Sequence, residues 1–198
     1  MEDYLKDIQD IRKMMDKSSQ FLSLSGLSGV LAGIYALLGA YAVYEITQDV
    51  VYIIFWDRTF NTIVAIASAV LLLSVLTAYI MTARKTKKQG DKVWNSATRR
   101  MSLNFLIPLA TGGIFSLLLI NNQYYGLIAP VMLLFYGMAC VNASKYTLRD
   151  VRYLGLTMIV IGLFAAYYIG YGLAFWALGF GVCHIIYGAV MYFKYDRN

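Results

Sequence analysis

The sequence predicts an all-α membrane protein with six transmembrane helices in a single domain, residues 1–198. Six long stretches contain no Asp, Glu, Lys or Arg, and 60% of the 198 residues are hydrophobic whereas 14% are charged. A helix needs roughly 20 mainly apolar residues to cross a bilayer, whereas membrane-spanning strands are short and alternate with polar positions. The predicted spans are Phe21–Tyr44, Asn61–Thr82, Met101–Ile120, Leu127–Ala143, Tyr153–Ile169 and Leu173–Phe193.

The connections between the spans differ in charge, and this difference predicts the orientation. The third and fifth connections carry no charge, whereas the second and fourth are basic. Because Lys and Arg are retained in the cytoplasm, we expect both termini to be cytoplasmic. The basic residues of the two connections are Arg84, Lys85, Lys87, Lys88, Lys92, Arg99 and Arg100, then Lys145, Arg149 and Arg152.

The net charge of +6 indicates attraction to anionic lipid headgroups. Membrane lipids are therefore expected partners. Nucleic acid is not, because no soluble basic domain accompanies the spans.

The first twenty residues predict a cytoplasmic amphipathic helix. Tyr4, Ile8, Ile11 and Met15 recur at helical spacing, and charged side chains fill the other face. A cleavable signal peptide begins with a short basic region, whereas here a long charged segment precedes the first span. We therefore expect that span to be a permanent anchor.

A Gly–aliphatic–aromatic signature recurs near the middle of the odd-numbered spans. It reads Gly33-Ile34-Tyr35, Gly113-Ile114-Phe115 and Gly162-Leu163-Phe164. The recurrence favours a threefold repeat of helical hairpins around an axis along the membrane normal. Such matches also arise by chance in a chain rich in Gly and aromatic residues.

Small residues form a stripe on the first span and another on the sixth. Lipid provides no hydrophobic drive for helix association, so close backbone approach must supply the contact energy. The sequence leaves open whether the stripes pack within the chain or form a homodimer. The stripe positions are Gly26, Gly29, Gly33, Ala36 and Ala40, then Ala174, Ala177, Gly181, His184 and Gly188. His184 interrupts the second stripe, so we expect it to face a neighbouring helix and not lipid.

Pro108 lies inside the third span and predicts a weakened or broken helix. It offers no N–H to the carbonyl of Asn104, and Thr111 and two glycines follow it. Non-helical backbone at membrane depth is tolerated where it lines a cavity or is buried in protein. The alternative is a kinked structural helix.

Four polar side chains share one depth in the predicted bundle. At about 1.5 Å per residue, Ser28, Thr111, Tyr136 and His184 lie roughly 10–15 Å from the cytoplasmic ends, and Asn104 is shallower. If they converge, they form a polar spot in an apolar cavity, which is typical of a small-molecule site. His184, the sole histidine, is either part of that site or a neutral imidazole hydrogen-bonded across helices.

Catalytic and metal chemistry are weakly supported. Gly26-Leu27-Ser28-Gly29 spells G-x-S-G, and a serine paired with His184 would resemble an intramembrane serine hydrolase, but no set of oxyanion donors accompanies it. Cys140 and Cys183 are the remaining soft ligands within the spans. Zinc needs three or four ligands, so we expect no metal and no other cofactor.

The lack of charge inside the spans disfavours an ion-coupled carrier of a charged solute. The leading hypothesis is a non-enzymatic protein that binds or passes a small neutral or lipophilic ligand. Its cavity would lie in the cytoplasmic half, near Asn104, Thr111, Tyr136 and His184. The alternative is a structural or regulatory protein that docks a partner and has a tightly filled bundle.

Four stretches carry a resemblance to known sequences: Ser23–Ala40, Ile107–Phe115, Phe135–Tyr146 and Ile185–Tyr195. They resemble a group of uncharacterised six-span membrane proteins from Bacteroidota. The resemblance implies a multi-pass protein of the bacterial inner membrane. It transfers no activity and no site residue, because none is established for that group.

Overall fold

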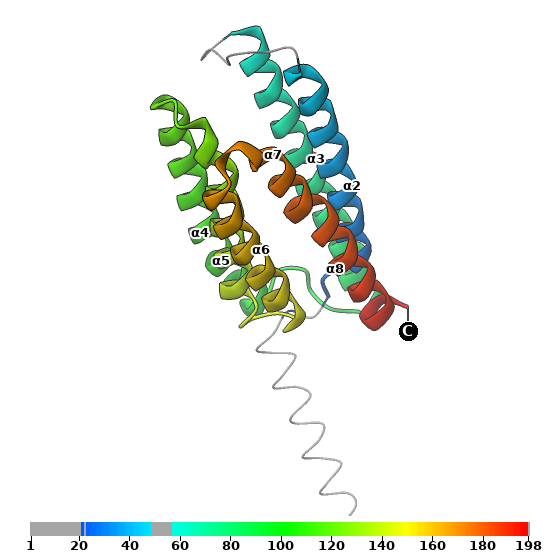
Figure 1. The fold of residues 1–198 in the computed structure, drawn as a ribbon. Coiled ribbons are helices and arrows are strands. Elements are labelled where there is room, and N and C mark those ends of the chain that lie inside the picture. The colour runs from blue at the N-terminus through cyan, green and yellow to red at the C-terminus, as the bar shows by residue number, and fades with distance from the viewer. Residues whose placement is uncertain (1–20, 22, 49–56, 198) are drawn as a thin grey trace, which may run out of the picture.

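The computed structural model describes residues 21, 23–48 and 57–197, which fold as helices and short connections (Figure 1). The first helices are α2 (Gly26–Thr47), α3 (Arg58–Lys88), α4 (Ser96–Asn121), the 3₁₀ turn η1 (Tyr125–Leu127), α5 (Ile128–Ala143) and α6 (Asp150–Tyr167). The last span consists of η2 (Ile169–Tyr171), α7 (Gly172–Trp176), the π-helix η3 (Ala177–Cys183), α8 (His184–Met191) and the π-helix η4 (Tyr192–Asp196).

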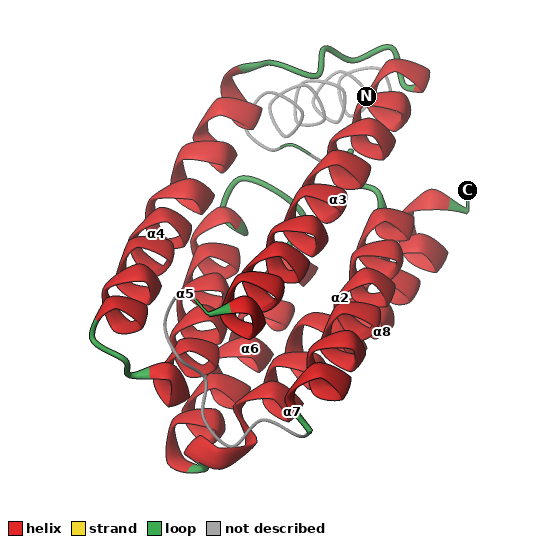
Figure 2. Cartoon of the chain, turned by 90° about the horizontal axis from the view of Figure 1, so that it is seen from above, coloured by secondary structure: helices red, strands yellow, loops and turns green. Residues whose placement is uncertain are grey.

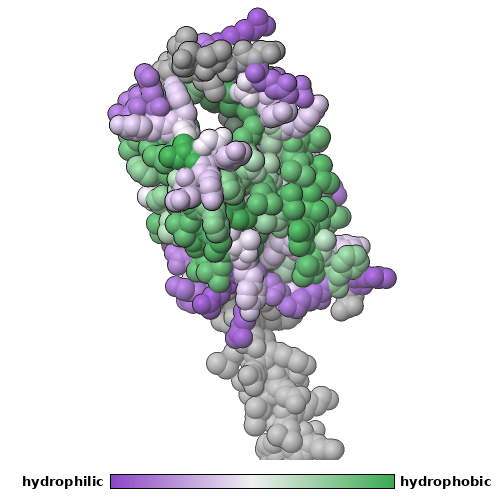
Figure 3. Space-filling model, viewed as in Figure 1, coloured by the Kyte–Doolittle hydropathy of each residue, from purple (hydrophilic) through white to green (hydrophobic). Residues whose placement is uncertain are grey.

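The prediction of six membrane-spanning helices is confirmed. Six helical segments of 18 to 31 residues are long and apolar enough to cross a membrane. Figure 3 shows an apolar belt around the middle of the molecule, with hydrophilic residues at both ends. The described residues are thus those of a multi-pass membrane protein. The amphipathic helix predicted for residues 1–20 lies outside the described residues.

α3 is longer than its predicted span, Asn61–Thr82, at both ends. The Asp57 carboxylate accepts a hydrogen bond of 2.6 Å from the N–H of Phe60 and so caps the N-terminus. Lysines occupy the last turn, where their positive charges interact favourably with the negative end of the helix dipole. Gly90 follows with a φ of 74°, a conformation that suits glycine and ends the helix.

The helices form two groups joined by the last span (Figures 1 and 2). α4, α5 and α6 pack together, as do α2 and α3, and the last span contacts both groups. Within the described residues, α3 packs mainly against α2, and its packing against α4 is at most slight. These contacts do not test the threefold repeat of hairpins, which stays a prediction.

The two small-residue stripes pack against each other within the chain. A Cβ added to Gly188 would lie 2.5 Å from the backbone nitrogen of Val30 and 2.7 Å from the carbonyl oxygen of Gly26. One at Gly33 would lie 2.6 Å from the carbonyl oxygen of Gly181. Only glycine allows this backbone approach. The stripes therefore form a seam between α2 and the last span within the chain, and a homodimer stays a prediction.

Asp196 ties three segments together at the basic end of the bundle. Its carboxylate accepts hydrogen bonds from the N–H of Gly26, at 2.8 Å, and from the Lys85 ammonium, at 2.5 Å. A further contact lies just before α2: the Thr147 hydroxyl donates a hydrogen bond to the carbonyl of Phe21. These contacts hold the start of α2, the end of α3 and the α5–α6 connection together.

α4 is continuous through Pro108, so the predicted break is wrong. A single proline removes one backbone hydrogen bond, and transmembrane helices tolerate this. The irregular backbone lies in the last span instead, where seven residues from Ala177 to Cys183 form a π-helix. Short π-helical segments inside helices often occur at functional sites.

Candidate functional site

Two of the predicted site residues, Tyr136 of α5 and His184 of α8, meet in the membrane interior. The Tyr136 hydroxyl lies 2.7 Å from Nε2 of His184. Nδ1 of His184 lies 3.1 Å from the carbonyl oxygen of Gly179, five residues earlier in the π-helix. The bond between the two side chains therefore links the α4–α5–α6 group to the last span.

The partners of His184 define which nitrogen of the ring carries the proton. A carbonyl oxygen can only accept, so Nδ1 carries the hydrogen and donates to Gly179. In a neutral imidazole, Nε2 then holds a lone pair and accepts from the Tyr136 hydroxyl. Both ring nitrogens are thus occupied by partners from the protein.

Aromatic rings enclose this pair. Phe180 stacks on His184 at a centroid distance of 5.9 Å, and its ring lies 5.1 Å from that of Tyr136. Phe105 of α4 meets Tyr136 edge to face at 5.8 Å. His184 is 8% exposed. The arrangement matches a neutral imidazole hydrogen-bonded across helices.

The other three predicted site residues do not join the pair. The buried Ser28 hydroxyl donates to the carbonyl of Ser25, and the Asn104 amide donates to the carbonyl of Arg100. Thr111 is exposed, and its hydroxyl donates to the carbonyl of Ile107. Of the five residues predicted to form the site from their depth, only Tyr136 and His184 are therefore in contact in the described structure.

A catalytic pair of Ser28 and His184 is not formed. Serine activation needs the serine oxygen within hydrogen-bond reach of the histidine base. The Ser28 hydroxyl donates to its own helix, and the ring nitrogens of His184 are paired with Tyr136 and Gly179. The arrangement of an intramembrane serine hydrolase is thus missing from the described residues.

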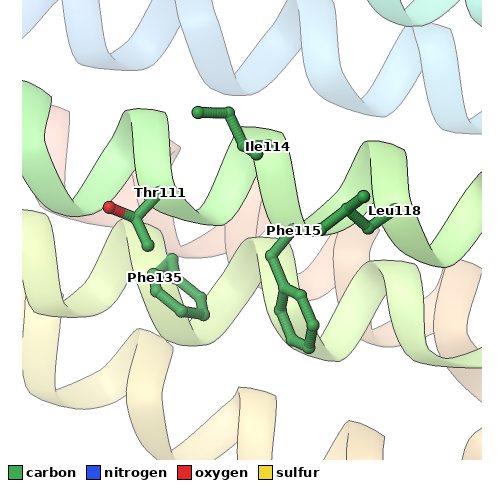
Figure 4. Close-up of a pocket in the computed structure, with 5 residues that line it drawn as sticks. All are labelled: Thr111, Ile114, Phe115, Leu118 and Phe135. Carbon is green, nitrogen blue, oxygen red and sulfur yellow. The ribbon is translucent and has the colours of Figure 1, made fainter.

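Thr111 instead lines a groove on the outer face of α4 and α5 (Figure 4). The groove has a volume of about 470 Å³. Figure 4 shows Phe115 and Phe135 side by side along it, with Thr111 next to Phe135; the two phenyl centroids are 6.3 Å apart. We refer to it as the α4–α5 groove, and its lining residues are Thr111, Ile114, Phe115, Leu118 and Phe135.

Gly112 positions the floor of this groove. A Cβ at Gly112 would collide with the side chain of Phe135, so the missing side chain lets that ring lie against the backbone of α4. Ser116, one turn further on, donates to the carbonyl of Gly112 at 2.8 Å and presents no free hydroxyl hydrogen there. Along α4, the residues that line the groove extend from Thr111 to Leu118.

The α4–α5 groove lies closer to the uncharged α4–α5 connection than to the basic one. It extends from Thr111 toward Asn121, the last residue of α4, whereas the cavity was expected in the half near the basic connections. Sequence reasoning identified Thr111 but missed its neighbours. Ile114, Phe115 and Leu118 follow it at three, four and seven residues, a spacing that places all four on one helix face.

Within the described ranges, no three His, Cys, Asp or Glu side chains form a group that could hold a metal ion. Cys140 and Cys183 are free thiols. The comparisons with known proteins give no further guide, because no family model, no curated protein and no solved structure matches this chain.

Proposed function

We propose that this multi-pass membrane protein binds a small lipophilic or neutral ligand in the α4–α5 groove. The observation that carries the proposal is a groove of about 470 Å³ with apolar walls and one hydroxyl, that of Thr111. This volume falls within the range of about 300–1,000 Å³ that is typical of small-molecule sites.

The chemistry of the lining selects the class of ligand. The lining residues include no titratable side chain, and an ion brought into hydrocarbon without a partner is costly. The Thr111 hydroxyl already donates to Ile107, so toward a ligand it can only accept a hydrogen bond. A ligand with an apolar body and at most one hydrogen-bond donor fits these groups best.

The proposal includes an orientation and a location. The ends of α3 and α5 and the starts of α4 and α6 lie at the same end of the bundle as Asp196 and carry the basic connections. The positive-inside rule assigns this end to the cytoplasm. Both termini would then be cytoplasmic. The resemblance to six-span proteins of Bacteroidota points to a bacterial inner membrane.

Two neighbouring leucines of α4 offer a matched test. Leu118 lines the α4–α5 groove, whereas Leu117 lies outside it, and they are 55% and 65% exposed. Native mass spectrometry of protein extracted in a mild detergent should show a retained adduct. We expect Leu118→Trp to fill the groove and remove the adduct, and Leu117→Trp to retain it.

Retention of the same adduct in both variants would overturn the proposal. The same spectra report the oligomeric state, since any self-association must use a face other than the seam between α2 and α8.

A further inference from the structure

The depth of the α4–α5 groove matches one leaflet of the membrane. Leu118 lies about 5 Å and Thr111 about 15 Å from Asn121, at roughly 1.5 Å per residue. One leaflet contributes about half of a hydrocarbon core of about 30 Å. The groove thus spans the acyl-chain region of the leaflet at the α4–α5 connection, and Thr111 lies near the midplane.

The outer end of the groove leads to uncharged polar side chains. Asn122 follows Leu118 by four residues and so lies one turn further along the same face. Its side-chain nitrogen donates to the carbonyl of Leu118 at 2.8 Å, which leaves the amide oxygen as an acceptor. Tyr124 is 61% exposed. A headgroup above the groove would meet amide and phenol groups.

The positions of the charged residues disfavour an anionic headgroup at this end of the groove. Within the described ranges, the charged residues at this end of the bundle are Glu45, Asp57 and Arg58. They belong to the end of α2 and the start of α3, and the packing of these helices against α4 is at most slight. The Lys and Arg residues of the connections lie at the opposite end, beyond the reach of a lipid in this leaflet.

From this geometry we infer that the α4–α5 groove holds an acyl chain of a membrane lipid whose headgroup carries no net charge. The inference rests on the proposed function and names its ligand class. The chain would lie along Ile114, Phe115 and Leu118 with its end near Thr111. The headgroup would accept hydrogen bonds from the Tyr124 hydroxyl or donate to the amide oxygen of Asn122.

The test uses the purified full-length chain, delipidated in detergent, and two lipids with identical acyl chains. Phosphatidylethanolamine is zwitterionic, and phosphatidylglycerol is anionic. Because phosphatidylglycerol can also bind the basic end, the readout is the fraction of each adduct that Leu118→Trp removes. Leu117→Trp is the control, and Ile114→Trp is a second filling variant in case Leu118→Trp does not fold.

We expect the filling variants to weaken the phosphatidylethanolamine adduct by about tenfold, as loss of about two buried methylene groups would. The phosphatidylglycerol adduct should change little. If the filling variants remove phosphatidylglycerol equally or more, the lipid class is wrong, although the groove still binds a lipophilic ligand. If they remove neither lipid nor any co-purified adduct, the proposed function fails as well.

Discussion

The last span and the outer face of α4 differ in how they use small and polar residues. In the last span, Gly188 brings two backbones into contact at the seam, and His184 bonds to Tyr136 of α5. On α4, Gly113 faces open space and Thr111 bonds only to its own helix. The difference shows that a buried polar residue in a membrane bundle can be a structural link, whereas the exposed Thr111 lines the groove that we propose as the ligand site.

The largest expected effect is the loss of stability when one methyl group is added at the seam. In Gly188→Ala the new Cβ would meet backbone atoms of Val30 and Gly26, which cannot rotate away, so the free energy of unfolding should fall by about 1–3 kcal/mol. Gly113→Ala is the matched control. It meets no atom within 4 Å and should be neutral or gain up to about 1 kcal/mol.

Chemical denaturation in one detergent would measure both free energies. Equal stability of the two variants would contradict the close approach of α2 and α8.

A smaller effect is expected from the link between Tyr136 and His184. Tyr136→Phe leaves Nε2 of His184 without its donor, and His184→Ala leaves the hydroxyl without its acceptor. A double-mutant cycle should give a coupling between about 0.6 and 1.7 kcal/mol, the mean and the maximum found for hydrogen bonds between membrane helices. Tyr79→Phe, at a residue that is 65% exposed, serves as the control. Additive effects of the two substitutions would show that the side chains are not bonded.

The smallest effect is expected at Thr111. Its hydroxyl is exposed and bonds to the carbonyl of Ile107 in the same helix, so Thr111→Val should change the free energy of unfolding by no more than about 0.5 kcal/mol. A loss as large as that of Tyr136→Phe would indicate that Thr111 has a structural partner and would remove the contrast between the two regions.

The sequence predicted the spans well because composition and charge determine them directly. It also predicted that His184 faces a neighbouring helix, since His184 interrupts a stripe of small residues. It could not separate a paired histidine from an open site, because the approach of α5 to α8 depends on packing between distant segments. The π-helix had no signal either, since Gly179 and Gly181 fit an ordinary helical stripe equally well.

Pro108 shows the limit of local reasoning in the same way. The proline and the glycines after it predicted a break in α4, yet the helix is continuous. Gly112 instead determines the position of Phe135, and this position creates the groove. That consequence depends on which helix lies opposite, which the spacing of residues along α4 does not encode.

Native mass spectrometry of the wild type, Leu118→Trp and Tyr136→Phe distinguishes a ligand in the proposed α4–α5 groove from one in the space around Tyr136 and His184. We expect an adduct that Leu118→Trp loses and Tyr136→Phe retains. An adduct that persists in Leu118→Trp but disappears in a folded Tyr136→Phe variant would contradict the proposal and assign the ligand to the space between α5 and α8.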